Sequence, residues 1–159
     1  MPAGNRPQLL HTPPPKPPHA KDLRKGRWSE VGRAYHVTAT TKGRQTLFRD
    51  LFNARCVIRS LMQSDLAGWS STWAFVLMPD HLHWLMELRR GTLAQVVGSV
   101  KSVSAHQIGG RVWQPGYHDH ALRSDEDLRV IARYIVANPL RAGLVTRIGD
   151  YPHWDAAWI

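Results

Sequence analysis

Apolar residues recur at two different spacings along this chain, and the spacings predict an alternation of strands and helices. Residues 33–41 are rich in β-forming side chains, which predicts a first strand. Between residues 47 and 62 the apolar positions have helical spacing, which predicts a first helix. Residues 73–88 form two apolar runs that Pro79-Asp80, a turn signal, separates. They predict a hairpin of a second and a third strand.

The second half of the chain continues this alternation. Thr92 and Gln95 have the spacing of a capping box at the head of a second helix, and Gly109 is expected to end that helix. Residues 117–123 predict a fourth strand. Ser124 and Asp127 have the spacing of another capping box, which predicts a third helix.

The predicted order of elements is βαββαβα. Pro139 is expected to end the third helix near Ala137, and the aromatic residues that follow are expected to pack back on the domain. The first six elements have the ferredoxin-like order, which belongs to the α+β class. We therefore expect a four-stranded antiparallel sheet with two helices on one face and the third helix as an addition.

Length and composition indicate one globular domain. The chain has 159 residues, of which 43% are hydrophobic, enough to bury a core. No apolar run approaches the roughly 18 residues of a membrane-spanning helix, and no apolar secretory segment is evident near the N-terminus. Cys56 is the one cysteine and cannot form an internal disulfide, which agrees with a reducing, cytoplasmic location.

The charge of the chain points to an anionic partner. The formal net charge is +9 and the pI is about 10.4, a balance that favours nucleic acid, although an anionic membrane would attract it too. Residues 1–27 carry seven of the eleven prolines and five of the nine net charges. We expect them to be a disordered basic arm that either contacts phosphates or keeps the protein soluble. The folded domain would then span residues 28–159.

His81 and His83 are candidates for a metal site. Successive side chains on a strand point to opposite faces, so these two imidazoles share one face and Leu82 and Trp84 share the other. Two imidazoles at this spacing on a rigid strand form a preset pair of nitrogen ligands for a divalent cation. The alternative is two polar residues on a solvated face of the sheet.

Tyr134 and Asn138 lie four residues apart on the third predicted helix, on the same face. A tyrosine oxygen is a nucleophile that can form a covalent intermediate, and the amide oxygen of Asn138 is a candidate third metal ligand. A metal held there would polarise a phosphodiester next to the tyrosine. The alternative is that Tyr134 fills the edge of the core and that Asn138 caps the helix.

Further candidates concern contacts with DNA. The second half of the chain holds basic residues and histidines that are suited to phosphates, although each is also an ordinary surface charge. They are Lys101, Arg111, His118, His120, Arg123, Arg133 and Arg141. His118 and His120 form a second His-x-His pair, and the alternative for them is a solvated strand face with Asp119 inward or paired. Trp69, Trp84 and Trp113 are candidates for stacking on unpaired bases, but Trp84 faces away from the histidines and is expected in the core.

Several motifs occur in a fixed order along the chain: residues 78–80 (MPD), residues 81–83 (HLH), residues 113–120 (WQPGYHDH), residues 134–145 (YIVANPLRAGLV) and residues 150–155 (DYPHWD). Together they resemble a known family, the REP-associated tyrosine transposases, which are single-tyrosine HUH transposase relatives of the IS200-like type. The resemblance covers about residues 28–159.

The resemblance implies a fold, a chemistry and a partner. Members fold as a ferredoxin-like sheet and cut single-stranded DNA at palindromic repeat hairpins, using Mg²⁺ or Mn²⁺ and a 5′-phosphotyrosine link. By position, His81 and His83 correspond to the metal pair, Tyr134 to the nucleophile and Asn138 to a third, amide ligand. The implied protein is a bacterial, cytoplasmic and nucleoid-associated DNA strand transferase without a membrane partner, a monomer or a homodimer.

Two other functions remain open from the sequence. One is a catalytically inactive nucleic-acid-binding module of the same fold, which would form no covalent adduct with DNA. The other is a metal-dependent phosphodiesterase that activates water; it would form no adduct either and would retain activity after Tyr134→Phe.

Overall fold

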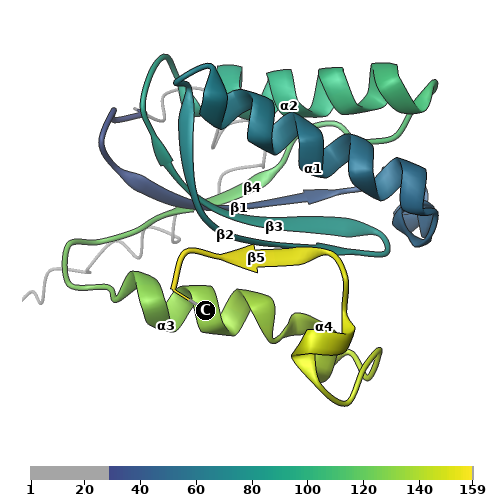
Figure 1. The fold of residues 1–159 in the computed structure, drawn as a ribbon. Coiled ribbons are helices and arrows are strands. Elements are labelled where there is room, and N and C mark those ends of the chain that lie inside the picture. Colours follow the sequence, from purple (N-terminus) through teal and green to yellow (C-terminus); the bar gives the residue numbers. More distant parts are fainter. Residues whose placement is uncertain (1–28, 159) are drawn as a thin grey trace, which may run out of the picture.

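The fold is built around a five-stranded antiparallel sheet (Figure 1). The computed structural model describes residues 29–158, so the predicted arm, residues 1–27, lies outside the described residues. The strands are β1 (Ala34–Thr40), β2 (Ser70–Met78), β3 (His81–Leu88), β4 (His118–Ala121) and β5 (Trp154–Ala156). Their order in the sheet is β4-β1-β3-β2-β5, which places β3 at the centre.

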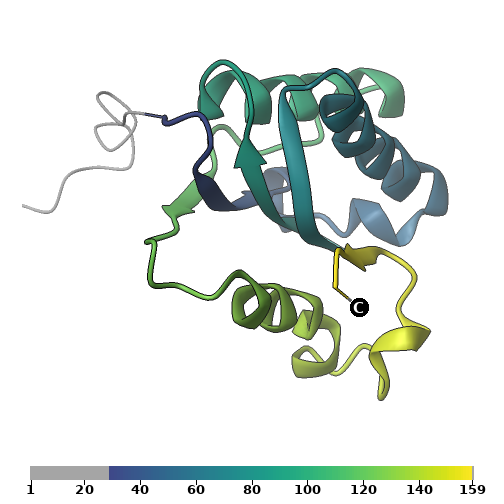
Figure 2. The same cartoon turned by 60° about the vertical axis from the view of Figure 1, so that its left-hand side comes forward.

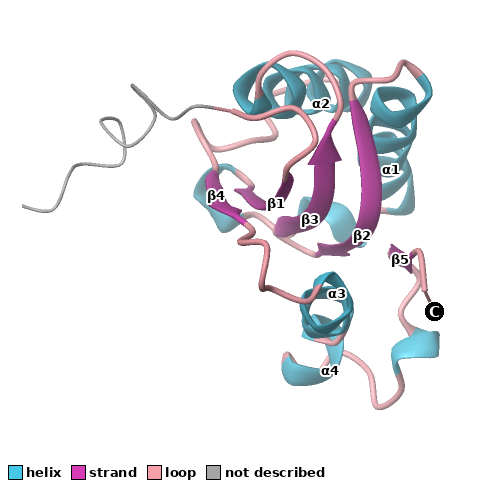
Figure 3. Ribbon diagram, turned by 90° about the vertical axis from the view of Figure 1, so that its left-hand side faces the viewer, coloured by secondary structure: helices cyan, strands magenta, loops and turns pink. Residues whose placement is uncertain are grey.

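Helices cover both faces of this sheet, as Figures 1 and 3 show. They are α1 (Leu51–Leu66), α2 (Leu93–Ile108), α3 (Leu128–Val136) and α4 (Asn138–Arg141), with short 3-10 helices at Lys42–Arg44, Leu47–Arg49 and Ile148–Asp150. The pair α1 and α2 lies on one face, whereas α3 and α4 lie on the other. Within residues 29–158 no helix is long and apolar enough to cross a membrane.

Local hydrogen bonds explain where the first two helices begin and end. Asp50 caps α1 by accepting from the backbone N–H of Asn53, so the helix starts later than the predicted residue 47. Thr92 and Gln95 form the predicted capping box at the start of α2. Gly109 ends this helix with a φ of 89°, a left-handed conformation that glycine adopts without steric cost.

The third helix begins three residues later than the predicted capping box. Its N-cap is Asp127, whose side chain accepts a hydrogen bond from the backbone N–H of Arg129. The prediction that Ser124 and Asp127 form a capping box is therefore wrong. Arg123 instead donates its backbone N–H to the carboxylate of Glu126, which stabilises the turn before the helix. The segment that contains this turn leads from β4 to α3, on the face of the sheet opposite to α1 and α2 (Figure 2).

The larger core lies between the sheet and the pair α1 and α2. Leu82 and Trp84 of β3 enter it together with Val57 of α1 and Val97 of α2. Trp84 is fully buried, and its indole N–H donates to the hydroxyl of Thr72 at 2.9 Å. The expectation that Trp84 belongs to the core is therefore confirmed.

A smaller core lies under α3, and the C-terminal segment completes it. Leu85 of β3 packs there with Ala132 and Ile135 of α3. The hydroxyl of Tyr151 donates to the carbonyl of Leu77 at 2.6 Å, and β5 then pairs with the edge of β2. The expected four-stranded sheet thus has a fifth strand. Trp154–Ala156 is only three residues long, too short to show the alternation that marks a strand in a sequence.

Candidate active site

His81 and His83 share the face of β3 that is turned toward α3. Leu82 and Trp84, their neighbours in the chain, are buried on the opposite face, as the alternation of the strand predicts. The two imidazole rings lie with centroids 4.9 Å apart and their planes at 82°. Because the strand is central in the sheet, this pair is held on a rigid element.

The ring of His81 is oriented by Asp80. The Nδ1 atom of His81 lies 2.6 Å from Oδ1 of Asp80, and a carboxylate accepts hydrogen bonds, so Nδ1 carries the proton. Oδ2 of Asp80 is paired with Arg44 at 3.2 Å. The lone pair of His81 is therefore on Nε2. A carboxylate that fixes the tautomer in this way is the usual second-sphere partner of a histidine that binds a metal.

His83 is surrounded by polar groups of β1. Its Nδ1 lies 3.1 Å from Nε2 of His36 and 3.2 Å from Oγ1 of Thr38. Burial, and then the charges of His81, His36 and Arg141, lower the pKa of His83 to about 3. The ring is therefore neutral near pH 7, as a histidine has to be to bind a metal.

His36 is a part of this site that sequence reasoning did not predict. Burial, and then the charge of His120, lower the pKa of His36, so this ring is neutral near pH 7 as well. Tyr35 and Val37 are buried on the other face, so the alternation of the first strand does place His36 on the polar face. What the sequence lacks is the register that pairs Thr38 with His83 and thereby brings His36 beside the same ring.

Tyr134 projects from α3 on the same side of the sheet. Its side chain is 58% exposed, so the interpretation that it fills the edge of the core is wrong. Ile135, the next residue, packs with Leu85 of β3, which lies on the same face as His83. Cζ of Arg141 stacks 3.9 Å from the centre of the Tyr134 ring, and the charge of Arg141 also acts on the pKa of His83. The tyrosine is thus an exposed hydroxyl on the histidine side of the sheet.

Asn138 occupies the junction between α3 and α4. Its Nδ2 donates to the carbonyl of Ile135 at 2.8 Å, which confirms that it caps the end of α3. The role of its Oδ1 as a metal ligand stays a prediction. In the described part of the chain no three His, Cys, Asp or Glu side chains gather in a way that could hold a metal ion. Completing a site on His81 and His83 therefore needs a different kind of ligand, such as this amide.

The second His-x-His pair lies on β4, at the edge of the sheet. His118 and His120 are exposed and Asp119 is half-buried. Nε2 of His120 lies 3.0 Å from Oε1 of Glu126, so this ring is engaged by a carboxylate of the segment before α3. His118 and His120 are therefore on a solvated strand face near the histidine pair of β3, with His120 opposite His36 in the ladder.

The predicted basic contacts divide between the two sides of the sheet. Arg133 and Arg141 are exposed on α3 and α4, the side that carries Tyr134. Arg123 is exposed in the segment that leads to α3. By contrast, Lys101 belongs to α2 and donates to the carbonyls of Gln114 and Gly116, and Arg111 is exposed in the loop after α2.

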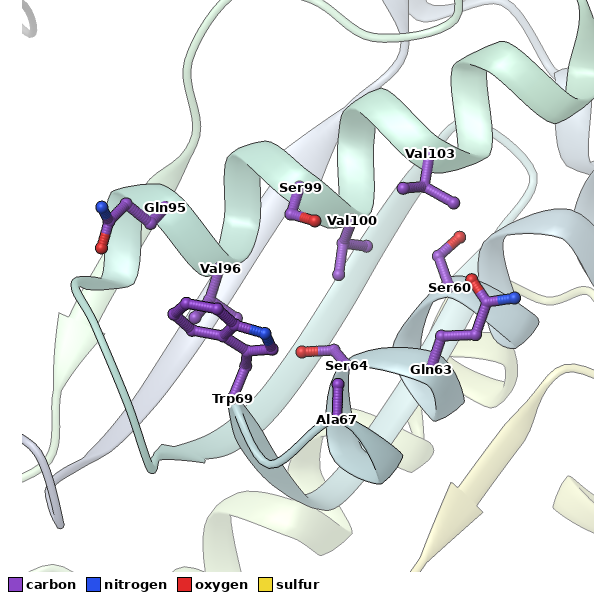
Figure 4. A pocket seen from close by; sticks show the side chains of 10 residues that line it. All are labelled: Ser60, Gln63, Ser64, Ala67, Trp69, Gln95, Val96, Ser99, Val100 and Val103. Carbon is purple, nitrogen blue, oxygen red and sulfur yellow. The ribbon is translucent and has the colours of Figure 1, made fainter.

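A pocket of about 340 Å³ opens between α1 and α2, on the other side of the sheet (Figure 4). Figure 4 shows Trp69 beside Val96 and Val100, with Gln63 and Gln95 at its rim. Neither the histidines nor Tyr134 line it, so the pocket is separate from the candidate active site. Of the other tryptophans that were stacking candidates, Trp113 is half-buried and its indole N–H donates to Ser104.

Comparison with known proteins identifies the family. Residues 31–138 match the sequence profile described as "Transposase IS200 like", which is more than half of the chain. The chain belongs to this family. The match begins before β1 and ends at Asn138, so it includes His81, His83 and Tyr134.

Two relatives with similar sequences support the resemblance predicted from the motifs. The chain is 32% identical over 91 residues to the REP-associated tyrosine transposase of Escherichia coli. This alignment covers 53% of this chain and 55% of that protein. A relative from Haemophilus influenzae is 27% identical over 99 residues, covering 52% and 56%. The chain thus spans about half the length of the curated relatives it matches.

A solved structure has the same fold. It is that of a REP-associated tyrosine transposase bound to a REP hairpin, with a TM-score of 0.71 and 23% identity. The match covers 81% of this chain and 79% of that chain. The α+β fold predicted from the sequence, and the resemblance to REP-associated tyrosine transposases, are therefore confirmed.

Proposed function

We propose that this protein cuts and rejoins single-stranded DNA at palindromic repeat hairpins through a covalent 5′-phosphotyrosine intermediate. The observation that carries the proposal is the placement of Tyr134. Its ring is exposed on α3, and it lies on the side of the sheet where His81 and His83 present their imidazoles. An exposed phenol in this position is accessible to DNA, whereas a tyrosine buried in the core beneath the helix would not be.

The reaction forms and breaks one bond at phosphorus in each step. The phenolic oxygen of Tyr134 bonds to phosphorus and its proton is released, while the bond from phosphorus to the 3′-oxygen breaks. The 3′-oxygen leaves with the electron pair and takes up a proton. The 3′-hydroxyl of a second strand then reverses these events on the phosphotyrosine. The bond energy stays in the phosphotyrosine, so rejoining needs no ATP.

The histidine pair fits a divalent metal by its chemistry. Asp80 fixes the lone pair of His81 on Nε2, and His83 is neutral, so both rings are able to act as ligands. Oδ1 of Asn138 would be the third donor. When bound, Mg²⁺ or Mn²⁺ would offset the charge that develops on the phosphate oxygens. Two imidazoles suit Mn²⁺ better than Mg²⁺, because Mg²⁺ favours all-oxygen ligand sets.

Two observations support DNA hairpins as the substrate. The chain has a net charge of +9, which favours a polyanion. The structural relative with a TM-score of 0.71 is bound to a REP hairpin. An unpaired flank next to the hairpin would let a single phosphodiester enter between Tyr134 and the histidines.

Labelled hairpins test this proposal directly. The protein is incubated with Mn²⁺ and a hairpin that has an unpaired flank, labelled either at its 3′ end or at its 5′ end. A 5′-phosphotyrosine link predicts that the 3′ label remains on the protein in denaturing gels, whereas the 5′ label is released on a shorter oligonucleotide. Tyr134→Phe should abolish the adduct and keep DNA binding.

Tyr151→Phe is the matched control for this experiment. It also removes a phenolic hydroxyl on the α3 side of the sheet, but that hydroxyl donates to the carbonyl of Leu77. Its stability should fall by about 1 kcal/mol with the adduct retained. Cleavage without an adduct that persists in Tyr134→Phe would identify a water-activating phosphodiesterase. Binding without any cleavage would identify an inactive binding module.

A further inference from the structure

Arg141 holds the ring of Tyr134. Its Cζ lies 3.9 Å from the ring centroid, and its Nη2 donates to the backbone carbonyl of Tyr134 at 2.6 Å. The first contact is a cation–π interaction, and the second satisfies a carbonyl in the last turn of α3. Both contacts together fix the guanidinium on one face of the exposed tyrosine.

The contact spans the junction between two helices. α3 ends at Val136, and α4 begins at Asn138 with Pro139 in its first turn. Arg141, seven residues after Tyr134, reaches back from α4 to the tyrosine.

No carboxylate of residues 29–158 forms an ion pair with Arg141. Within residues 29–158 the arginines that form ion pairs with carboxylates are Arg33, Arg44, Arg89 and Arg147. A guanidinium has five N–H donors, and the carbonyl of Tyr134 accepts from only one of them. Arg141 therefore presents a positive charge and N–H donors next to the hydroxyl-bearing ring.

Arg141 also lies on the side of the sheet that carries the histidine pair. Its partner Tyr134 projects from α3, which packs through Ile135 with Leu85 of β3, and Leu85 lies on the same face as His83. Arg141 thus contacts the tyrosine and lies on the same side of the sheet as the ligand pair. A phosphodiester that enters between them would meet the guanidinium.

We propose that Arg141 binds a non-bridging oxygen of the phosphodiester that Tyr134 attacks, while its stacking holds the tyrosine ring in place. This inference rests on the proposed function. The planar guanidinium matches the geometry of phosphate oxygens, and a fixed cation there opposes the negative charge of the developing phosphorane-like transition state. The phenolate that forms on Tyr134 is stabilised by the same charge.

Substituting an arginine with a purely structural role would also slow adduct formation or weaken DNA binding. The test therefore combines a protein variant with a substrate variant. Arg141→Met removes the charge and keeps an unbranched apolar side chain in place of the aliphatic stem. The substrate variant is a hairpin with one neutral methylphosphonate at the cleaved position, which lacks one charged non-bridging oxygen. Arg59→Met, an exposed arginine on α1, is the control for the loss of one positive charge.

The rate of adduct formation is measured in a single turnover at saturating DNA. On the phosphodiester, Arg141→Met should be slower than the parent by about 100-fold, the scale of one lost transition-state donor. On the methylphosphonate the two proteins should differ by less than about threefold, since the missing charge has no partner there. Arg141→Lys should recover part of the rate, because it keeps the charge without the planar stack.

A second measurement separates this inference from the proposed function. In the Tyr134→Phe background, which forms no covalent bond, Arg141→Met should weaken binding of the phosphodiester hairpin and leave binding of the methylphosphonate hairpin unchanged. An equal loss of affinity for both hairpins would overturn the phosphate contact. A rate of adduct formation that Arg141→Met leaves unchanged would also overturn it. Absence of any adduct in the parent, with this difference in binding retained, would overturn the proposed chemistry and leave the phosphate contact standing.

Discussion

Nε2 of His36 lies 3.1 Å from Nδ1 of His83, across the ladder between β1 and β3. Both rings have lowered pKa values and are neutral near pH 7. When Nε2 of His83 is a metal ligand, its proton is on Nδ1 and needs an acceptor. His36 and Thr38 are the two acceptors within hydrogen-bonding distance. His36 is thus a partner for His83 in the way that Asp80 is for His81.

This contact makes His36 a positioning residue for the proposed metal. His36→Phe keeps an aromatic ring and removes the acceptor, so Mn²⁺ affinity should fall by about tenfold, since Thr38 can still accept. Calorimetric titration of the protein with Mn²⁺ measures the change. His106→Phe, on α2 across the sheet, should leave the affinity unchanged. Equal affinities of His36→Phe and the parent would show that His36 does not orient His83.

Substitutions of Asn138 separate its two roles. Asn138→Ala removes both the donor to Ile135 and the proposed ligand, so both the melting temperature and Mn²⁺ affinity should fall. Asn138→Asp keeps an oxygen ligand but loses the donor, so the stability loss of about 1 kcal/mol should remain while Mn²⁺ affinity is restored or increased. Thermal melting and calorimetry give the two readouts. If Mn²⁺ affinity is the same in all three proteins, Asn138 only caps α3.

The folded protein should lose stability as the pH falls below about 6.5. His36, His83 and His153 have pKa values below that of an unfolded histidine; burial is the main cause in each, with the charge of Arg55 adding to it at His153. Below the unfolded pKa the unfolded chain binds protons that these folded groups do not bind, so the free energy of unfolding decreases, whereas above it these groups contribute no pH dependence.

The size of this effect follows from His83. With a folded pKa of about 3 against 6.5 unfolded, it alone destabilises the fold at pH 5 by roughly 2 kcal/mol. Chemical denaturation between pH 7.5 and 4.5 in the presence of a chelator measures the slope. His83→Gln, which cannot titrate, should make the slope shallower. A stability that stays constant from pH 7 to 5 would contradict the neutral state of these rings.

The basic segment at residues 1–27 is proposed to contribute to DNA affinity. It holds five of the nine net positive charges, and each phosphate contact with a single strand contributes roughly 0.7 to the slope of log affinity against log salt. Deleting the segment should flatten this slope by up to about 3 and leave the rate of adduct formation at saturating DNA unchanged. Hairpin binding at several salt concentrations, with and without the segment, provides the measurement. An unchanged slope would assign this segment no contact with DNA.

The sequence predicts the parts of the fold that have a strong periodicity. The alternation in residues 81–88 placed both histidines on one face, and the capping box of Thr92 and Gln95 marked the start of α2. The sequence could not show β5, because three residues carry no periodicity. It also misplaced the start of α3, because Ser124 and Asp127 have the spacing of a capping box but Asp127 alone caps the helix. His36 needed the strand register, which is set by pairing between distant segments.

The different side chains on the two faces of β3 make the protein sensitive to the alignment of this strand with β1. Leu82 and Trp84 fill the core under α1 and α2, and His81 and His83 alternate with them on the side of α3. A slip of β3 by one residue against β1 would exchange the two sets, placing imidazoles in the hydrophobic core and a tryptophan at the proposed metal site. A substitution that loosens the alignment of β3 should therefore damage folding and the proposed chemistry through the same movement.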